Sequence, residues 1–554
     1  MTTDQRPWLA QYPKGVPANI DDTKYDSLKD FIEETCQKYS NKPAFSCMGK
    51  TISFAEVNIL SNAFAGYLHY RGLRPGDKLA LMMPNLLQYP IALFGALKAG
   101  LIIVNTNPLY TPREMKHQFT DSGASAILIA ENFAANLEKV IGETEIKTVI
   151  TTSLGEMLPF PKKQLVNFVV RRVRRLVPAF NLPGAVSFQQ ALKEGKGKPI
   201  VEFEGCPEDL IALQYTGGTT GVSKGAMLTN QNLVGNTMQS IAITAPFIEE
   251  ASASVLCPLP LYHIFAFTVN CLAIFGRGQC NVLITNPRDL KTVVKAFKDH
   301  KIAAVIGVNT LFNALVNNPD FQQLDFSALK LTVGGGTAVQ RPVAEAWEKL
   351  TGVVLSEGYG LTEASPCVTM NPLDGRNRIG SIGLPLPSTD VRIWMEEEQR
   401  PGNSGEIGEL QVRGPQVMIG YYNRPEETQK VFMDGWLCTG DIATMMDDGF
   451  FKIVDRKKDM ILVSGFNVFP NEVEDVLAGH PKVLELAAIG VPSDKSGEVV
   501  KVFVVRKDPS LTKEEIIAYA RENLTGYKVP KEVEFREELP KTNVGKILRR
   551  HLRE

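Results

Sequence analysis

The sequence predicts an α/β protein made mainly of parallel sheets covered by helices. Apolar runs of strand length alternate with segments of helical period, as at residues 78–83, 101–105, 125–130, 303–308 and 331–336. Runs without polar alternation are typical of strands that are buried on both faces, as in parallel sheets. The chain has 554 residues, which is too long for one hydrophobic core. We therefore expect two or more domains.

The N-terminal part of the chain contains neither a secretion signal nor a membrane span by its pattern. Residues 1–15 have no apolar core of the kind that a signal peptide needs. The longest apolar stretch, residues 91–106, is interrupted by Lys98 and Gly100 and is shorter than the ~20 residues of a membrane span. It predicts a buried helix, a turn and a buried strand. We expect a cytoplasmic protein without a transmembrane helix.

Charge and cysteine content exclude several classes of function. The 60 basic and 61 acidic residues leave a formal charge of -1, which disfavours a nucleic-acid partner. The 8 cysteines form no CxxC pair and no metal-like spacing with histidine. This usage is typical of a reducing compartment, without disulfides or structural zinc.

Residues 215–226, YTGGTTGVSKGA, predict a phosphate-binding loop. The strand-like LIALQY precedes it, and a segment readable as a capped helix, MLTNQNLVGNTM, follows. A glycine loop between strand and helix can surround phosphate oxygens with N–H groups, and a lysine adds a mobile charge. The loop is not a P-loop, because Ser223 precedes Lys224 and Gly225 follows it. The alternative is a flexible linker.

The pattern changes twice in the last third of the chain. From about Asp390 the segments VRIWM, IGELQVRG and MIGYY, separated by Gly/Pro-rich turns, predict a small all-β unit. After the charged stretch DRKKDM the chain predicts strand, helix, strand, strand and helix. Capping-box patterns at Asn471–Glu474 and Thr512–Glu515 are expected to begin the two helices. The charged stretch is a plausible domain hinge.

Three short motifs supply groups that a bound nucleotide needs. EGYGLTEASP at residues 357–366 contains Tyr359, a flat face for a purine, and Glu363, a hard oxygen ligand for magnesium. GWLCTGDI places Asp441 after a turn, where its carboxylate could accept hydrogen bonds from ribose. PKTNVGKILRR carries Lys546 in a glycine turn. Taken singly, each could be an ordinary surface residue, and a basic C-terminal tail is usually solvated.

The order and spacing of these motifs resemble the adenylate-forming (AMP-binding) superfamily of acyl-CoA synthetases, luciferases and peptide-synthetase adenylation domains. The resemblance covers nearly the whole chain. Residues 83–114, 260–267, 307–327 and 455–476 most resemble bacterial long-chain fatty-acyl-CoA synthetases of fatty-acid degradation.

The resemblance implies three parts of the chain. Residues 1–455 would form a large N-terminal adenylation domain of two doubly wound α/β subdomains plus a small β-barrel-like subdomain. Residues 456–460 would form a hinge around Lys458, and residues 461–554 a small, mobile α+β domain.

The implied activity is ATP-dependent ligation of a long-chain fatty acid to coenzyme A. The reaction would pass through an acyl-adenylate, would release AMP and pyrophosphate, and would use Mg²⁺ bound with ATP. Two alternatives stay open: a ligase that transfers the acyl group to a carrier-protein thiol, and a non-catalytic acyl or adenylate sensor. A sensor would be expected to lack Lys224, Glu363 or Lys546, and all three are present.

The resemblance also implies residue roles. The β- and γ-phosphates would be held by Thr216, Gly217, Gly218, Thr219, Thr220, Gly221 and Lys224. Magnesium would be directed by Thr216 and Glu363. The ATP site would be completed by Gly334, Gly335, Gly336, Glu357, Gly358, Tyr359, Gly360, Thr362, Asp441 and Arg456. The catalytic set would be Lys546, Lys224, Glu363 and Arg456. Rotation of the C-terminal domain would then bring Ser464 and Gly465 toward the coenzyme A thiol.

The segment PLYHIFAF predicts the class of acid substrate. Relatives that activate amino acids have an aspartate after the aromatic residue, to bind the substrate ammonium, whereas this chain has His263. Without that carboxylate an α-amino acid is disfavoured. The expected acyl pocket consists of His263, Phe267, Val308 and Asn309, with Phe267 where some relatives have a tunnel gate. Plain core packing is the alternative for the aromatic residues.

Residues 162–180 predict a helix that the nucleotide chemistry does not require. Six basic residues interleave with apolar ones from Lys162 to Phe180, as in interfacial helices on anionic membranes. The expectation is peripheral contact with the inner face of the cytoplasmic membrane. The alternative is a helix that packs its apolar side on the domain. The sequence does not determine the oligomeric state, and a homodimer is one of the states that it allows.

Overall fold

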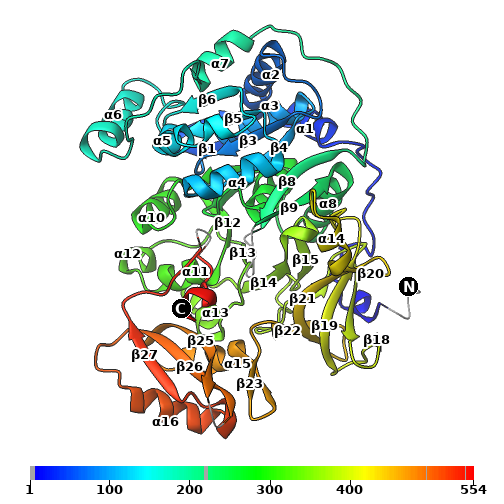
Figure 1. Ribbon diagram of the computed structural model, residues 1–554, viewed down its shortest axis with the longest axis vertical. Coiled ribbons are helices and arrows are strands. Elements are labelled where there is room, and N and C mark those ends of the chain that lie inside the picture. The colour runs from blue at the N-terminus through cyan, green and yellow to red at the C-terminus, as the bar shows by residue number, and fades with distance from the viewer. Residues whose placement is uncertain (1–5, 217–222, 494–495, 543–544, 554) are drawn as a thin grey trace.

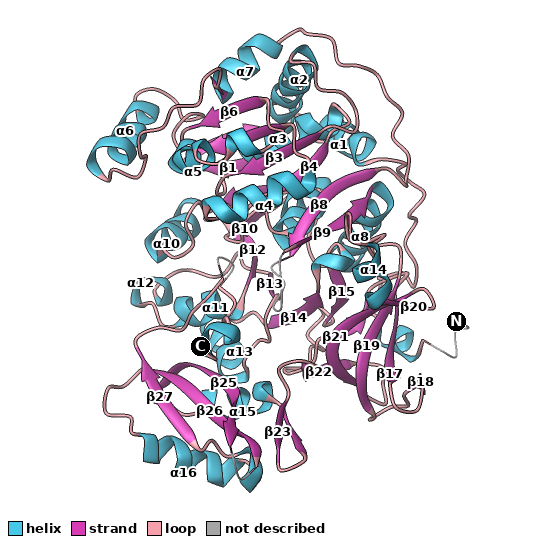
Figure 2. Cartoon of the chain, in the orientation of Figure 1, coloured by secondary structure: helices cyan, strands magenta, loops and turns pink. Residues whose placement is uncertain are grey.

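The computed structural model describes residues 6–216, 223–493, 496–542 and 545–553. Its strands form four sheets (Figure 1). Two of them, with their helices, make up the upper and central parts of the molecule. A smaller antiparallel sheet lies at one side, and the C-terminal domain lies below (Figure 2). The predicted α/β class is confirmed.

The first α/β sheet is covered by helices on both faces. Its seven strands run in the order β7-β6-β5-β3-β4-β8-β9, and only β9 is antiparallel to its neighbour. Alternate residues of β3 enter different cores: Leu79 and Leu81 join the main core with α2 and α3, while Ala80 and Met82 face α4. The strands are β3 (Lys78–Met82), β4 (Ile102–Asn105), β5 (Ala126–Ala130), β6 (Thr148–Thr152), β7 (Val186–Ser187), β8 (Leu210–Thr216) and β9 (Lys224–Thr229).

The second α/β sheet combines strands from distant parts of the chain. Its nine strands run in the order β16-β15-β14-β13-β12-β10-β11-β1-β2, with β1 parallel to β11. Residues 43–53 therefore share a sheet with residues 254–385. The strands are β1 (Pro43–Cys47), β2 (Lys50–Ser53), β10 (Ser254–Cys257), β11 (Cys280–Leu283), β12 (Ile302–Gly307), β13 (Leu331–Gly334), β14 (Leu355–Gly360), β15 (Cys367–Met370) and β16 (Leu384–Pro385).

Local sequence explains where several helices begin and end. Capping boxes start α2 at Ser53, α4 at Thr111 and α8 at Thr229, each satisfying otherwise free N–H groups. Left-handed glycines, Gly123 and Gly352, end α4 and α13. The α-helices of the large domain are α1 (Leu28–Lys38), α2 (Phe54–Tyr70), α3 (Gln88–Lys98), α4 (Pro112–Ser122), α5 (Ala134–Glu138), α6 (Lys162–Phe168), α7 (Phe188–Gly195), α8 (Asn230–Thr244), α9 (Ile264–Ala266), α10 (Leu290–Asp299), α11 (Asn309–Val316), α12 (Pro319–Gln322), α13 (Arg341–Thr351) and α14 (Pro425–Val431).

The setting predicted for the glycine loop is wrong in one respect. The chain does not pass from the loop into a helix. It returns as the antiparallel strand β9, with Thr216 opposite Lys224, and α8 begins only at Asn230. Four of the six residues of Lys224–Thr229 are buried and the other two are half-buried, so the segment is a strand by its pairing with β8 and not by an alternating burial pattern. Any phosphate held there would meet loop N–H groups and Lys224 rather than a helix N-terminus.

The predicted all-β unit is an open antiparallel sheet, because no pairing among its described strands joins the first strand to the last. Its order is β18-β17-β19-β21-β20, and β22 also pairs with β21. The segment MIGYY is not a strand of this sheet. It is a loop bound to β9, where Gly420 accepts from Met227 N–H and Tyr422 N–H donates to Gly225. The strands are β17 (Asp390–Met395), β18 (Arg400–Pro401), β19 (Ile407–Arg413), β20 (Phe432–Met433), β21 (Trp436–Met445) and β22 (Phe451–Arg456).

The C-terminal domain has its own core between a five-stranded sheet and two helices. Where one strand was expected before the first helix, the structure has a hairpin of two strands. A further strand, β27, follows the second helix. The capping box at Thr512 is confirmed, but that at Asn471 is wrong, because α15 begins at Pro470 and Asn471 N–H donates to Asp455 instead. The elements are β23 (Ile461–Val463), β24 (Phe466–Val468), α15 (Pro470–Ala478), β25 (Val483–Ser493), β26 (Gly497–Arg506), α16 (Lys513–Asn523) and β27 (Glu532–Arg536).

The helix predicted over residues 162–180 is shorter than expected. It consists of α6 and a π-helical turn, Val169–Val173, and it protrudes beside the first sheet (Figure 1). Arg175 has a φ of 50°, a left-handed conformation that does not continue a helix. Across the part of the chain that the structure describes, no helix has the length and apolar character required to cross a membrane.

Candidate active site

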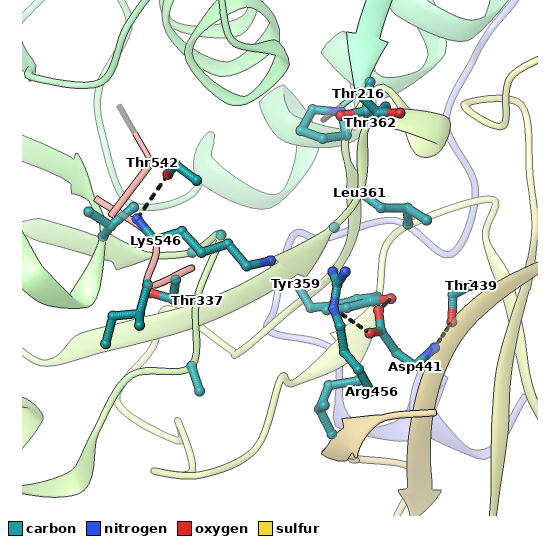
Figure 3. A pocket seen from close by; sticks show the side chains of 18 of the residues that line it. Thr216, Thr337, Tyr359, Leu361, Thr362, Thr439, Asp441, Arg456, Thr542 and Lys546 are labelled. Carbon is teal, nitrogen blue, oxygen red and sulfur yellow. Dashed lines mark hydrogen bonds and ion pairs between the residues drawn. The ribbon is translucent and has the colours of Figure 1, made fainter. Parts of the chain in front are cut away.

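One cavity of about 2560 Å³ collects most of the predicted site residues. It is lined by residues of both α/β sheets, of the antiparallel sheet and of the C-terminal domain (Figure 3). The predicted residues that line it are Thr216, Lys224, His263, Val308, Asn309, Gly335, Gly336, Glu357, Gly358, Tyr359, Gly360, Thr362, Glu363, Asp441, Arg456, Lys458 and Lys546. Residues far apart in the sequence thus surround one space.

Some predicted residues are not brought to this cavity. Gly334, Phe267, Ser464 and Gly465 are absent from its described lining. Phe267 is fully buried in the main core, while Phe265 faces the cavity in its place. Gly217, Gly218, Thr219, Thr220 and Gly221 lie outside the described residues.

At the end of the cavity where phosphate binding is predicted, Lys224 and Glu363 contact side chains of the loop and helix that follow strand β19. The Lys224 ammonium forms an ion pair with Glu427 at 2.5 Å and lies 4.9 Å from the centre of the Tyr421 ring. The Tyr421 hydroxyl donates to Glu363 at 2.7 Å. One tyrosine therefore contacts both residues.

The residues at this end fit a magnesium ion that arrives with ATP. Glu363 offers a carboxylate and Thr216 a hydroxyl, which are the hard oxygen ligands that magnesium prefers. Within the described ranges no group of three or more His, Cys, Asp or Glu side chains could hold a metal by itself. Phosphate oxygens and water would have to complete the coordination shell.

At the opposite end, three side chains form a connected group (Figure 3). The Tyr359 hydroxyl donates to Asp441 at 2.6 Å, and the Arg456 Nε lies 3.3 Å from the same carboxylate. Asp441 and Arg456 are opposite each other on β21 and β22, so the sheet register sets their distance. Burial, then Asp441, raises the pKa of Tyr359 far above its usual value, which keeps the hydroxyl a donor.

Close packing against backbone requires glycine at position 360, whereas the side chain that faces Gly358 could move. A Cβ on Gly358 would lie 2.8 Å from Met370, and one on Gly360 would lie 2.1 Å from the Pro366 carbonyl oxygen. Both distances are shorter than real Cβ contacts. Gly336 has a φ of +76°, which L side chains rarely adopt. The strict requirements for glycine are therefore at Gly360, which faces a backbone carbonyl, and at Gly336, which has a positive φ.

Glu357 lies beside these glycines and is nearly fully buried. Burial raises the pKa of Glu357 to about 8, although the Val339 N–H opposes the rise. The carboxyl group is therefore mainly protonated at pH 7. A neutral carboxyl can both donate and accept hydrogen bonds, as the edge of a purine requires.

Lys546 reaches into the cavity from the C-terminal domain, toward Arg456 (Figure 3). Its loop is held by hydrogen bonds between Thr542 and Lys546 in both directions. The Thr310 hydroxyl of α11 donates to the Gly545 carbonyl at 3.2 Å. Burial, then the Arg456 charge, lowers the pKa of Lys546 to about 8. The side chain is still mainly an ammonium at pH 7, and a bound anion would stabilise that charge in the buried site.

His263, predicted to stand in place of the aspartate of amino-acid-activating relatives, lines the cavity. Burial, then the Lys546 charge, lowers the pKa of His263 to about 4, so the ring is neutral at pH 7. Its neighbours in the cavity wall include Ile264, Phe265 and Val308. A neutral ring among apolar side chains offers no counter-ion to an ammonium group.

The predicted hinge residue and the predicted coenzyme A turn lie in different places. Lys458 lines the cavity, and burial, then Arg456, lowers its pKa. Ser464 and Gly465 form the turn of the β23–β24 hairpin, with φ values of 50° and 83°. Next to this turn, Phe466 is 55% exposed and stacks on Tyr527. In this arrangement Lys546, and not the turn, occupies the cavity.

Sequence reasoning missed the residues that support the site. Tyr421 and Glu427 belong to a stretch that was interpreted only as part of a β unit, and Arg549 belongs to a tail whose basic residues are usually solvated. The tyrosine and the acidic pair in GYYNRPEET were visible signals. Nothing in the sequence places them beside Lys224 and Glu363, because the fold alone makes that contact.

The fold and the site define an AMP-binding enzyme. The family model for AMP-binding enzymes matches residues 32–422, and that for the AMP-binding enzyme C-terminal domain matches residues 472–546. The chain belongs to this family. It is 56% identical over 548 residues to the long-chain-fatty-acid–CoA ligase of Escherichia coli O157:H7, covering 99% of this chain and 98% of that protein. It is 57% identical over 551 residues to the ligase of the same name from Yersinia pestis, with the same coverage.

Solved structures share the whole fold. The anthranilate CoA ligase AuaEII in complex with anthranoyl-AMP has a TM-score of 0.85 at 25% identity, over 96% of this chain and 97% of that chain. ATP-bound MatB from Rhodopseudomonas palustris has a TM-score of 0.82 at 26% identity, and apo MatB has 0.72; both comparisons cover 95% of this chain and 98% of that chain. The shape of this chain is therefore nearer to the ATP-bound form of MatB.

Proposed function

We infer that the chain is an ATP-dependent, AMP-forming ligase that joins a long-chain fatty acid to coenzyme A. The observation that carries this inference is Lys546, a half-buried lysine of the C-terminal domain that shares one cavity with Lys224 and with the Asp441–Arg456 pair. Cations at both ends of one cavity suit the reaction of a carboxylate with a polyphosphate.

In the first step the fatty-acid carboxylate attacks the α-phosphorus of ATP. A P–O bond forms, the bond to the β-phosphate oxygen breaks, and pyrophosphate leaves with the electron pair. Lys546 and Arg456 would neutralise the approaching carboxylate and the α-phosphate. Lys224 would stabilise the charge of the departing pyrophosphate. Because the charges develop at fixed positions, preorganised cations stabilise the transition state more than they stabilise bound substrate.

The ribose and the metal would be held by residues already in place. Asp441 would accept from the ribose hydroxyls, with Tyr359 and Arg456 fixing its carboxylate. Glu363 and Thr216 would hold a magnesium ion, which would supply positive charge to the phosphates. Mg²⁺ with ATP and coenzyme A as co-substrate complete the reactants.

In the second step the coenzyme A sulfur attacks the acyl carbonyl. A C–S bond forms, the C–O bond to AMP breaks and AMP leaves with its electron pair, and the thiol proton is released to water. We assign residues 1–455 to the adenylation domain, 456–460 to the hinge and 461–554 to the moving domain. Rotation about Lys458 would remove Lys546 from the cavity and bring Ser464 and Gly465 toward the thiol.

The acyl class follows from the wall near His263. A neutral histidine with Phe265, Val308 and Asn309 suits an uncharged chain rather than an amino acid. Phe267 would act from the core, as a support of this wall.

Acceptor and acid specificity test the proposed function in one assay. With ATP and magnesium, long-chain fatty acids should drive exchange of pyrophosphate into ATP, and free amino acids should not. Addition of coenzyme A should then yield acyl-CoA, measured by mass spectrometry. Acyl transfer to a carrier protein in preference to coenzyme A, exchange with an α-amino acid, or no exchange at all would each contradict the proposal.

We also propose that residues 160–176 contact an anionic membrane, at the inner face of the cytoplasmic membrane. Five large apolar side chains here are more than half exposed: Phe160, Leu165, Phe168, Val173 and Leu176. Arg172, Arg174 and Arg175 are also exposed among them. Apolar insertion together with basic charge is the pattern of a peripheral membrane anchor. Arg171 is already engaged by Glu131, at 2.9 and 2.5 Å.

Replacing Arg172, Arg174 and Arg175 with glutamine should weaken binding to anionic vesicles. Each arginine should contribute on the order of 1 kcal/mol near the surface, and high salt should have a similar effect. Co-sedimentation with anionic and with neutral vesicles measures the change. The contribution of the apolar side chains is tested by the double variant Phe160→Ser, Phe168→Ser, which should also bind vesicles more weakly. The control is Ile59→Ser, because Ile59 is 62% exposed but lies outside this segment. If every variant sediments like the wild type, the segment is an ordinary solvated helix.

A further inference from the structure

The hinge region contains a buried cluster that the proposed chemistry does not use. Asp455, the residue before the hinge, belongs to β22 of the large domain and is fully buried. Arg456, beside it, faces the cavity and pairs with Asp441. Because successive residues of a strand point to opposite faces, Asp455 points away from Asp441.

Asp455 accepts hydrogen bonds from two elements of the C-terminal domain. Asn471 N–H, in the first turn of α15, donates to it at 2.8 Å, and the Arg549 guanidinium donates at 3.3 Å. A third hydrogen bond, from Arg456 N–H at 2.7 Å, is local. The carboxylate thus joins the last strand of the large domain to both α15 and the C-terminal tail.

Arg549 lies three residues after Lys546 and is largely buried. It donates to Glu474 at 2.9 and 3.1 Å, to Asn471 at 2.6 Å and to Asp459 at 3.5 Å, in addition to Asp455. Burial raises the pKa of Asp455 to about 6, and the Arg549 charge opposes that rise. The guanidinium therefore helps to keep Asp455 ionised at pH 7.

Within this cluster, the bonds that Asp455 accepts from Asn471 and Arg549 depend on the domain arrangement. Glu474, Asn471 and Arg549 all follow the hinge and would move together. Rotation about Lys458 would change the position of Asp455 relative to all three. Its two bonds from the C-terminal domain belong to the arrangement in which Lys546 occupies the cavity.

We propose that Asp455 and Arg549 are positioning residues that clasp the two sides of the hinge, hold Lys546 in the cavity, and so favour adenylate formation over thioester formation. The proposal rests on the proposed two-step function. Neither residue contacts the reacting atoms. The clasp acts by setting how often the C-terminal domain adopts the arrangement with Lys546 in place.

The two half-reactions, measured separately, test the clasp. Asp455→Asn keeps the size of the side chain and an acceptor for N–H groups, but loses the charge that faces Arg549. We expect adenylate formation, measured as pyrophosphate release without coenzyme A, to slow about ten- to a hundredfold. Thioester formation from synthetic acyl-adenylate should be unchanged or faster. Arg549→Gln should act in the same direction, and the double variant should lose little more, because both changes break one contact.

Domain arrangement gives a readout that does not depend on activity. Asn313 of α11 donates to the Leu484 carbonyl of β25 at 3.0 Å, so these positions lie close together across the two domains. Cysteines at Asn313 and Leu484, with exposed Cys206 changed to serine, should form a disulfide. Asp455→Asn should slow its formation. Arg536→Gln is the matched control, because the Arg536–Glu534 pair lies within the C-terminal domain.

The outcomes separate the clasp from the function itself. Equal losses in both half-reactions, an unchanged rate of disulfide formation, or multiplicative losses in the double variant would each overturn the clasp. Thermal unfolding measurements identify any variant that loses its fold. If Arg549→Gln is unfolded, the Asp455→Asn results alone test the clasp. If the parent protein releases no pyrophosphate with any fatty acid, the proposed function fails, and the disulfide rates still test the clasp.

Discussion

Replacing Lys546 with alanine should lower the rate of adenylate formation by about two to three orders of magnitude, the cost of removing one preorganised transition-state group. The loss should fall on kcat more than on the KM for ATP, because the charge acts where the carboxylate meets the α-phosphate. Pyrophosphate release in a single turnover without coenzyme A measures the effect. Thioester formation from synthetic acyl-adenylate should continue at nearly the wild-type rate.

The control for this variant is Lys541→Ala. Lys541 lies in the same tail, but its ammonium pairs with Glu485 of the same domain at 2.6 Å. It should cause a much smaller loss than Lys546→Ala. Loss of both half-reactions in Lys546→Ala would mean that the lysine supports the whole fold of the domain rather than one step.

Replacing Lys224 with alanine should lower kcat/KM for ATP about a hundredfold, the size expected when a charge-assisted contact to phosphate is lost. The affinity for AMP, which lacks the outer phosphates, should change little. Initial rates at varied ATP and equilibrium binding of AMP measure the two effects. ATP must also displace Glu427 from Lys224, so Glu427→Gln should cause a far smaller loss than Lys224→Ala.

Lys430→Ala is the matched control for the phosphate lysine. Lys430 pairs with the same carboxylate, Glu427, at 2.6 Å, but is 66% exposed and is not among the described residues that line the cavity. Its loss should barely alter kcat/KM for ATP. If both lysine variants lose activity equally, the effect comes from general charge at the rim and not from contact with the outer phosphates.

The sequence predicted those parts of the fold whose residues are so apolar that they can be stable only in the buried core. Residues 79–82 and 126–130 are apolar throughout, and they lie in strands buried on two faces. Predictions failed where short segments depend on a distant partner. Strand β9 exists because it pairs with β8, and the loop MIGYY remains extended along β9 because its backbone hydrogen bonds are made there. Neither partner is visible in local composition.

The candidate site was predictable where function concentrates unusual residues into short motifs. Thr216, Tyr359, Glu363, Asp441 and Lys546 each stand in such a motif, and all of them line the same cavity. Their supporting partners could not be predicted. The contact between Tyr421 and Glu363 spans 58 residues, and that between Lys224 and Glu427 spans 203. Such contacts are set by the packing of whole subdomains, which sequence periodicity does not describe.

The pairing of β1 with β11 has a consequence for synthesis on the ribosome. Strand β1 ends at Cys47, and its parallel neighbour begins at Cys280. At typical translation rates the early hairpin of β1 and β2 must wait on the order of ten seconds or longer for that neighbour. During this time one edge of β1 has no strand beside it. The strand contains the apolar residues Ala44 and Phe45, which are buried in the folded protein. We expect nascent chains that stop short of Cys280 to be captured by a chaperone that binds apolar strands, and longer nascent chains to be released from it.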